Sequence, residues 1–575
     1  MSIFRTKSIA TLQGDDSAHG KGLHRVLTMR DLTFFGIAAI IGAGSFSSLG
    51  EACYRGGPGV VYLFIICGIA CAFTAFCYAE FATRIPVAGS AYTYAYASFG
   101  ELLAWIIGWA LIMEYSIGNI YVAFSWSDYF TGFLHKINIH IPAYFTCSYK
   151  EAKDLATAFA GDGTMKLNTT QKEVLQAWNT APLLAGVKMI ADIPAFCINI
   201  FITYLVYKGV KESKNFSNVM VILKLAVVLL VIIVGATYIN PENWMPANDA
   251  GVHSFMPNGF GGVMMAVSGV FFAYIGFDAV SVLAEESKNP QRDLPRGMIY
   301  SLVICTVVYI LLALVLTGVV NYREFEGVGD PLAKIFEVKN VGWMQMLVSI
   351  CAVVAMTSVL LVFQMGQPRI WMSMSRDGLL PHVFQKIHGK NQTPSFSTIV
   401  TGAIVGIPLF FVDKTFVLDF TSIGTLFAFV LVCGGVLLLP PRPKEKGKFH
   451  LPFISSRFIF PAILAIAVAV LLWKAPSYFS DVLVWNGEHA CYNLSSFILW
   501  IVLIALMIAG FFKNFSLIPL LGLSTCLYLL TGMTPNNWLW FGIWFGIGLA
   551  VYFAYGYHHS RLHNRHHPIL HLPKD

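Results

Sequence analysis

Residues 42–45 have the sequence Gly-Ala-Gly-Ser and interrupt an apolar run that extends over residues 34–49. Glycine weakens a helix because it loses more backbone freedom on folding than any other residue. In a lipid bilayer every backbone N–H and C=O needs a partner, so a broken helix is tolerated only where it faces protein or a watered cavity. A break here would leave backbone N–H groups without partners inside the helix. We expect these groups to face a ligand.

Three ionisable residues, Glu114, Lys224 and Asp278, also lie well inside apolar runs. Charged side chains inside a membrane are costly and usually functional. Lys224 lies too deep to reach the surface easily, and burial disfavours its charged form. Glu114 could meet a cationic group or hold Lys224, and Asp278 could fix a helix break by accepting backbone N–H groups.

The composition places these residues in a membrane protein. The chain has 575 residues, of which 56% are hydrophobic and only 12% are charged, whereas about a quarter of a soluble protein is charged. The apolar residues form blocks of about twenty, long enough to cross a hydrocarbon core of roughly 30 Å. This favours an all-α polytopic membrane protein over a β-barrel, which needs short alternating segments. The net charge of +7 comes with basic residues in short loops, so a nucleic-acid partner is not expected.

Apolar runs predict about fourteen transmembrane spans, at 33–52, 58–80, 101–130, 189–208, 217–238, 262–283, 298–320, 343–366, 397–412, 416–439, 453–473, 495–512, 515–532 and 537–557. Lys and Arg are concentrated in alternate short loops, which marks the cytoplasmic side. Both termini are therefore predicted to be cytoplasmic, in a multi-pass protein of the cell (inner or plasma) membrane. The long segment 131–188 is predicted to lie outside, as a small ordered cap.

The sixth predicted span contains a second candidate break, at residues 273–276. Gly276 and Asp278 lie in mid-membrane there and are followed by further apolar residues. Transporters often contain an inverted repeat with interrupted helices at matching positions in both halves. Breaks in spans one and six match two halves of five spans each. The alternative is a simple kink at Gly276 with packed aromatic side chains.

Four stretches resemble a known superfamily. Residues 271–298, FFAYIGFDAVSVLAEESKNPQRDLPRGM, resemble the sixth-helix signature of the amino acid–polyamine–organocation (APC) superfamily, and are most similar to its cationic amino acid transporter (CAT) branch and the bacterial permeases of that branch. Residues 86–115, 367–380 and 423–430 resemble further segments of the same branch. The similarity covers about residues 30–440. Ser45 departs from it, because the family usually has Ile or Val there.

The resemblance implies a LeuT-like fold of two inverted five-helix repeats, with helices 1 and 6 broken, that works by alternating access. It divides the chain into a cytoplasmic segment 1–32, a transporter core 33–440 that includes the external loop 131–188, four additional spans in 441–557 and a His-rich cytoplasmic tail 558–575. It also implies an amino acid substrate, with transport driven by protons in bacterial relatives or by gradients in animal CAT proteins.

An amino acid needs donors for its carboxylate and acceptors for its amine. The second half of span one should begin near Gly44 with free N–H groups at the positive end of its dipole, and these suit the carboxylate. Carbonyl groups at the end of the first half-helix and in span six suit the amine. The candidate substrate site comprises the N–H groups of Ala43, Gly44 and Ser45, the carbonyls of Ile40, Ile41, Phe271, Phe272 and Tyr274, and Gly276 at the second break.

Lys224 is the candidate coupling residue, together with Glu114 and Asp278. Its amine would bridge span five to span one, where sodium-coupled proteins of the same fold bind sodium. The resemblance supports this, since bacterial CAT-like permeases carry a lysine in this span. A purely structural ion pair with Glu114 or Asp278 is the alternative.

These observations predict a secondary active amino acid transporter that imports its substrate with protons. Its expected partners are the amino acid, protons and the lipid bilayer, and neither a metal nor another cofactor is expected. A polyamine or organic amine transporter of the same fold is an alternative, although it would not need a carboxylate site. A non-transporting amino acid sensor is another. An enzyme is not expected, because the spans show neither a nucleophile–base pair nor a metal cluster.

Overall fold

The computed structural model describes residues 5, 27–84, 90–161, 167, 169–184, 186–209, 214–247, 251–283, 287–389, 393–439, 448–485 and 490–562. Most of the predicted N-terminal segment 1–32 and most of the tail 558–575 lie outside these residues. So do residues 86–89 of the second motif.

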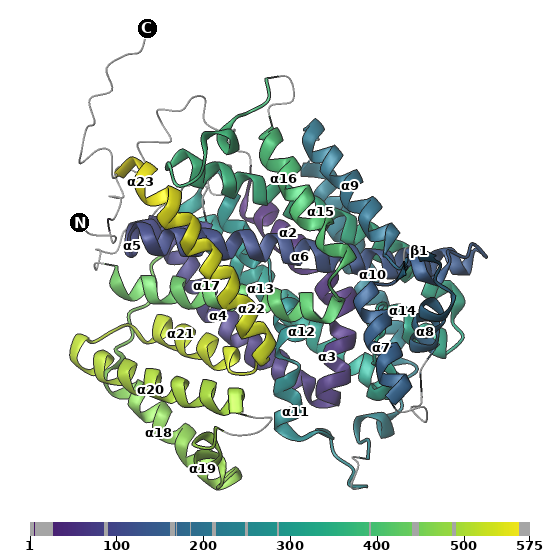
Figure 1. Ribbon diagram of the computed structural model, residues 1–575. Helices are drawn as coiled ribbons and strands as arrows, with labels where there is room; N and C mark the ends of the chain where they lie inside the picture. The colour runs from purple at the N-terminus through teal and green to yellow at the C-terminus, as the bar shows by residue number, and fades with distance from the viewer. Residues whose placement is uncertain are drawn as a thin grey trace.

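The described chain is helical apart from one small antiparallel hairpin (Figure 1). The hairpin pairs β1 (Leu183–Leu184) with β2 (Val187–Lys188). Nine described helices are long and apolar enough to cross a membrane, or ten if one bent pair is a single span. This confirms an all-α polytopic membrane protein. The count of fourteen spans stays a prediction, because α9 (Ile193–Lys208), α16 (Ser395–Gly406) and α21 (Leu517–Leu530) are apolar but shorter.

The remaining helices used below, in chain order, are α2 (Met29–Ile40), η1 (Gly44–Ser48), α3 (Leu49–Gly56), α4 (Val60–Arg84), α5 (Ser90–Ser98), α6 (Glu101–Lys136), α7 (Tyr149–Gly161), α8 (Thr169–Thr180), α10 (Lys214–Ala236), α11 (Gly259–Met265), α12 (Val267–Phe272), η5 (Phe277–Leu283), α13 (Pro290–Val319), α14 (Pro331–Val338), α15 (Gly342–Arg376), α17 (Lys414–Leu438), α18 (Ser456–Lys474), α19 (Tyr478–Val482), α20 (Ala490–Lys513), α22 (Pro535–Val551), η9 (Tyr552–Gly556) and α23 (Tyr557–His559).

Several helices extend beyond the apolar runs that predict them. The helix α13 begins at Pro290, eight residues before the predicted span at 298, and α15 continues to Arg376, ten residues beyond 366. Proline suits the first turn of a helix because its missing N–H would be unpaired there anyway. Hydropathy detects only the part of a helix that lies in lipid, so polar helical ends are missed.

The first predicted span is broken between Ile40 and Gly44. The helix α2 ends at Ile40, and Ile41 is extended with φ −78° and ψ 90°. The chain then re-enters a helix as the π-turn η1, in which the N–H groups of Ser45 and Phe46 both donate to Gly42 O at 3.1 Å. The break therefore coincides with the glycine-rich stretch.

The sixth predicted span is interrupted twice. The helix α11 and the segment Val267–Ser281, which begins with α12, meet at an angle of 44° at Ala266. A turn then occupies residues 273–276, where Gly276 has φ +115°, and the 3₁₀-helix η5 follows. Glycine adopts such a positive φ without steric cost.

The helices α6 and α15 pack against each other at the centre of the molecule and share buried polar side chains. Asn119 of α6 donates to Gln364 of α15, whose amide nitrogen donates to Thr203 on α9 at 2.8 Å. Gln367 donates to Ser116 at 2.6 Å. Hydrogen bonds of this kind join helices where lipid supplies no hydrophobic driving force.

The last helices pack beside this centre. The indole N–H groups of Trp105 and Trp109 on α6 donate to the carbonyls of Gly548 and Trp544 on α22, each at 2.9 Å. The helices α18, α19 and α20 lie together at one edge of the molecule, next to α21 (Figure 1). Their large apolar side chains, such as Phe458 with 72% of its surface exposed, face outward as expected for lipid contact.

Candidate functional site

The two breaks touch each other through their glycines. A Cβ atom placed on Gly44 would lie 2.5 Å from Ala273 Cα, so only glycine allows this approach of span one to span six. In the reverse direction, a Cβ on Gly276 would lie 2.9 Å from the carbonyl carbon and oxygen of Ala39 on α2. The structure therefore brings the two predicted breaks together at the centre of the helix bundle.

Tyr309 of α13 joins the two breaks. Its side chain is fully buried, and its hydroxyl lies 2.9 Å from Ile40 O and 2.8 Å from Ala273 O, close enough to donate to either carbonyl. The two carbonyls come from the ends of the interrupted helices, where acceptors lack helical partners. The sequence analysis missed this residue. Its only sequence signal is a tyrosine hydroxyl inside an apolar span, where such a group needs a partner.

The predicted carboxylate site differs in detail at Ser45. Its N–H and its hydroxyl both point to Gly42 O, at 3.1 and 3.3 Å. Within the described part of the chain, the N–H groups of Gly42, Ala43 and Gly44 have no hydrogen-bond acceptor. The free donors at the break thus begin one residue earlier than predicted, because the π-turn already uses the Ser45 N–H.

The predicted amine acceptors divide into used and free carbonyls. Phe271 O accepts from the Tyr274 N–H at 2.9 Å, and Phe272 O accepts from the Ile275 N–H at 3.2 Å. Tyr309 occupies Ile40 O. Among the described residues, the carbonyls of Ile41 and Tyr274 have no donor.

The side chain of Tyr274 points away from the breaks. Its hydroxyl donates to Phe64 O on α4 at 2.8 Å, and its ring packs against Phe64 and Tyr309. Only the backbone of Tyr274 is therefore placed to meet a ligand.

Lys224 lies against the first half of span one. It is 2% exposed, its Nζ donates to Ser358 Oγ on α15 at 2.7 Å, and the same atom lies 3.5 Å from Ala38 O on α2. A cavity of about 10 Å³ adjoins it, about the volume needed to hold one water molecule. The ion pairs of the described residues do not include one between Lys224 and Glu114 or Asp278.

Glu114 and Asp278 are both buried in the interior. Glu114 is 4% exposed and lies against Thr425 of α17, within electrostatic reach of Asp278. Asp278 is 3% exposed, and its carboxylate accepts from the backbone N–H groups of Gly276, Asp278 and Ala279. Asp278 thus holds the turn that follows the second break.

Comparison with known proteins identifies the family. A sequence profile described as "Amino acid permease" matches residues 27–487, and one described as the C-terminus of amino acid permeases matches residues 516–560. The chain belongs to the amino acid permease family. This confirms the resemblance to APC proteins, and it makes the chain a multi-pass membrane permease rather than an enzyme.

Relatives within the amino acid permease family differ in the substrates in their names. The branched-chain amino acid permease BcaP of Bacillus subtilis is 40% identical over 473 residues, which cover 82% of this chain and 92% of the relative. A methylthioribose transporter of the same organism is 39% identical, with the same coverage of both chains. The vacuolar cationic amino acid transporter 2 of Arabidopsis thaliana is 34% identical over 77% of this chain and 64% of the relative. Sequence identity alone therefore does not choose among these substrates.

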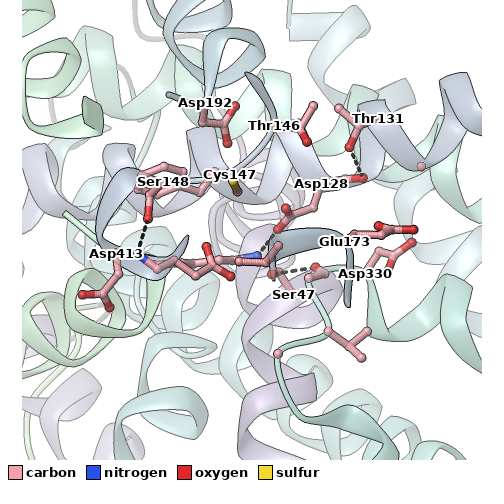
Figure 2. A pocket seen from close by; sticks show the side chains of 18 of the residues that line it. Ser47, Asp128, Thr131, Thr146, Cys147, Ser148, Glu173, Asp192, Asp330 and Asp413 are labelled. Carbon is pink, nitrogen blue, oxygen red and sulfur yellow. Dashed lines mark hydrogen bonds and ion pairs between the residues drawn. The ribbon is translucent and has the colours of Figure 1, made fainter. Parts of the chain in front are cut away.

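This permease has a large cavity of about 740 Å³ on the side of the cap. The cap consists of α7, α8 and the hairpin around a small apolar core that includes Cys147, Ala152 and Ala177. The cavity, here called the vestibule, lies between the cap, α6, α17 and the segment 327–345. Figure 2 shows Asp413 at its left and Glu173 and Asp330 at its right.

The vestibule is acidic and cross-linked by ion pairs. Nine of its lining residues are Asp or Glu and four are Lys. Lys150 of the cap pairs with Asp413, and Lys414 of α17 pairs with Asp128 of α6. Burial, followed by the nearby charge of Asp128, raises the pKa of Glu151 to about 7. Burial and Asp128 raise the pKa of Asp330 to about 7 in the same way.

Tyr121 lines the vestibule beside η1. Its hydroxyl lies 3.4 Å from Ser47 Oγ in η1, and both residues line the cavity. Its ring meets the ring of Phe272 edge to face, with the centroids 4.6 Å apart. Lys414 Nζ lies over the Tyr121 ring, 5.4 Å from its centroid. This aromatic pair connects the lining of the vestibule to Phe272, the residue before the second break.

Within the described residues, no group of three or more His, Cys, Asp or Glu side chains is arranged to hold a metal ion.

Proposed function

We propose that this protein is a secondary active amino acid transporter that imports its substrate together with protons. It works by alternating access, in a LeuT-like fold of two inverted five-helix repeats. The core is residues 33–440, with four additional spans in 441–557. The loop 131–188 lies outside the cell, and the segments 1–32 and 558–575 lie in the cytoplasm.

The observation that carries this proposal is the pair of touching breaks with free backbone groups of both kinds. The N–H groups of Ala43 and Gly44 supply donors for a carboxylate at the positive end of a helix. The carbonyls of Ile41 and Tyr274 supply acceptors for an ammonium group. These four groups come from the predicted site, and they match the two charged ends of an amino acid.

Four other backbone groups of the predicted site are already hydrogen-bonded within the breaks, namely those of Ser45, Ile40, Phe271 and Phe272. They become available to the substrate when these bonds break on binding. Gly276 keeps span six close to α2. The breaks can rearrange at low cost, since turns at interrupted helices have few regular hydrogen bonds to lose.

Lys224 provides the coupling. Its amine ties α10 to α2 and α15 while protonated, and loss of the proton would weaken its hold on Ala38 O. Glu114 and Asp278 form the second part of the coupling system. Two carboxylates in a low-dielectric interior cannot both be charged cheaply, so a proton or a substrate cation between them is favoured.

The vestibule supplies the path to the site from outside. Tyr121 and Phe272 act as the outer gate, since their ring contact joins a residue that lines the vestibule to the residue before the second break. A polyamine would use the acidic vestibule but would leave the N–H groups of Ala43 and Gly44 unused, which favours an amino acid.

Reconstitution into proteoliposomes tests the function. The labelled substrates are leucine, valine, arginine, lysine, putrescine and methylthioribose, each offered with and without an inward proton gradient. We expect uptake of one or more amino acids, accelerated by the gradient and blocked by a protonophore. Uptake of putrescine or methylthioribose without any amino acid would overturn the substrate assignment. Amino acid uptake that ignores the gradient would overturn proton coupling alone.

A further inference from the structure

The C-terminal end of the last span is fastened to the start of α6, far from it in sequence. Glu101, the first residue of α6, is 1% exposed, and its carboxylate accepts hydrogen bonds from Tyr552 at 3.0 Å and from Ser560 at 2.5 Å. A third hydroxyl, that of Tyr96 on α5, lies 3.2 Å away. A buried carboxylate needs such donors, and bonds to a charged group are among the stronger ones.

A second attachment joins the same segment to the end of α15. The N–H of Arg561 donates to Asp377 O at 3.0 Å. A Cβ atom on Gly378, where φ is +82°, would lie 2.3 Å from His559 O. The two backbones are therefore in direct contact, and a side chain at Gly378 would separate them.

The two residues that hold the C-terminal segment, Glu101 and Asp377, also accept hydrogen bonds from the short helix α5. Tyr92 and Tyr96 are four residues apart and share one face of it. The hydroxyl of Tyr92 donates to the Asp377 carboxylate at 2.6 Å, and that of Tyr96 donates to Glu101. On the other side of α5, the ring of Tyr94 stacks on Phe81 of α4 with the centroids 4.9 Å apart.

The helix α5 thus lies between two groups of elements. One side packs on α4 and also contacts η5, the half of span six that follows the second break. The other side is held by Glu101 and Asp377, which in turn hold the C-terminal end. Figure 1 shows α23 near α5, away from α7 and α8 of the cap.

We propose that the end of the last span, residues 552–561, is a latch that fixes α5 as a cover over the face opposite the vestibule, with Glu101 as its positioning residue. Release of this latch is the step that lets that face open. The inference goes beyond the proposed function, because it assigns a role in transport to the last span and to α5.

The test compares Ser560→Ala and Tyr552→Phe, which remove one hydroxyl each from Glu101, with two matched controls. Ser524→Ala removes a hydroxyl that bonds only to its own helix, at Leu520 O, and Tyr555→Phe removes a hydroxyl that makes no hydrogen bond among the described residues. Ser560→Thr restores the donor and serves as the rescue.

Two measurements are made on the full-length protein. Hydrogen–deuterium exchange of the purified protein reports opening of residues 90–104, where we expect roughly tenfold faster exchange in Ser560→Ala, as for loss of a bond to a charged group. Uptake in proteoliposomes should show an apparent KM several-fold higher, because fewer molecules present the open vestibule. The controls and Ser560→Thr should behave as wild type.

Unchanged exchange at residues 90–104 in both Ser560→Ala and Tyr552→Phe would overturn the latch. A lower Tm with uptake reduced at constant KM would also overturn it, because that result describes support of the fold without control of opening. The exchange measurement needs no substrate, so the latch can hold or fail independently of the transport function.

Discussion

Replacement of Gly44 by alanine tests whether contact between the two breaks is required. The new Cβ would lie 2.5 Å from Ala273 Cα, about 0.9 Å closer than an ordinary contact of 3.4 Å. The neighbouring atom belongs to the backbone and cannot swing aside as a flexible side chain could. Overpacking of this kind costs about 1–3 kcal/mol. A cost of that size disfavours the touching arrangement by roughly 5- to 150-fold.

The assay is initial uptake of the best substrate by reconstituted Gly44→Ala, with Gly546→Ala as control. Both changes add one methyl group to a glycine in the membrane region, but a Cβ on Gly546 meets no atom within 4 Å. We expect Gly44→Ala to lose at least about fivefold in uptake while it stays monodisperse, and Gly546→Ala to behave as wild type. Wild-type uptake by Gly44→Ala would refute the reasoning, because the breaks would then not need to touch.

Three further predictions address single groups. Tyr309→Phe leaves Ile40 O and Ala273 O without their shared donor, so substrate affinity should fall roughly fivefold, as measured by binding calorimetry; an unchanged affinity would exclude Tyr309 from the site. Lys224→Met keeps the length of the side chain but removes its charge, so uptake should no longer respond to an imposed pH gradient. A response of normal size would rule out Lys224 as the coupling residue. Because the folded protein raises the pKa of Glu151 from 4.5 to about 7, the folded state binds the proton more tightly than the unfolded state, and Tm should fall as the pH rises from 5 to 8. Glu151→Gln should flatten that part of the Tm profile, and an identical slope in the variant would contradict the assignment.

The sequence predicts the breaks because their cause is local. Two glycines within three residues weaken span one wherever it packs, and α2 does end at Ile40. The close approach of Gly44 to Ala273 was not predictable in the same way, since it depends on how two distant segments dock. Tyr309 shows the same limit, because its two acceptors come from residues 269 and 36 positions earlier in the chain.

Ser45 is where reasoning from the helix dipole alone predicts a free N–H group that the structure does not have. A helix that starts at Gly44 should leave its first N–H groups free, and Ser45 belongs to that first turn. At the start of η1 the N–H of Ser45 instead donates to Gly42 O, three residues earlier, a hydrogen-bond spacing that neither composition nor periodicity reveals. Free donors were thus predicted at the right break, with an error of one residue.

The two faces of the molecule differ in what closes them. On the cap side, the ring of Tyr121 meets that of Phe272 next to the second break, and the ion pairs of Lys150 and Lys414 join the walls of the vestibule. On the other side, α5 is packed on α4 and tied at Glu101 to the last span. A transporter that works by alternating access must break the contacts that hold α5 when the contacts on the cap side become tighter. Substitutions at Lys414 and at Glu101 should therefore move the apparent KM in opposite directions.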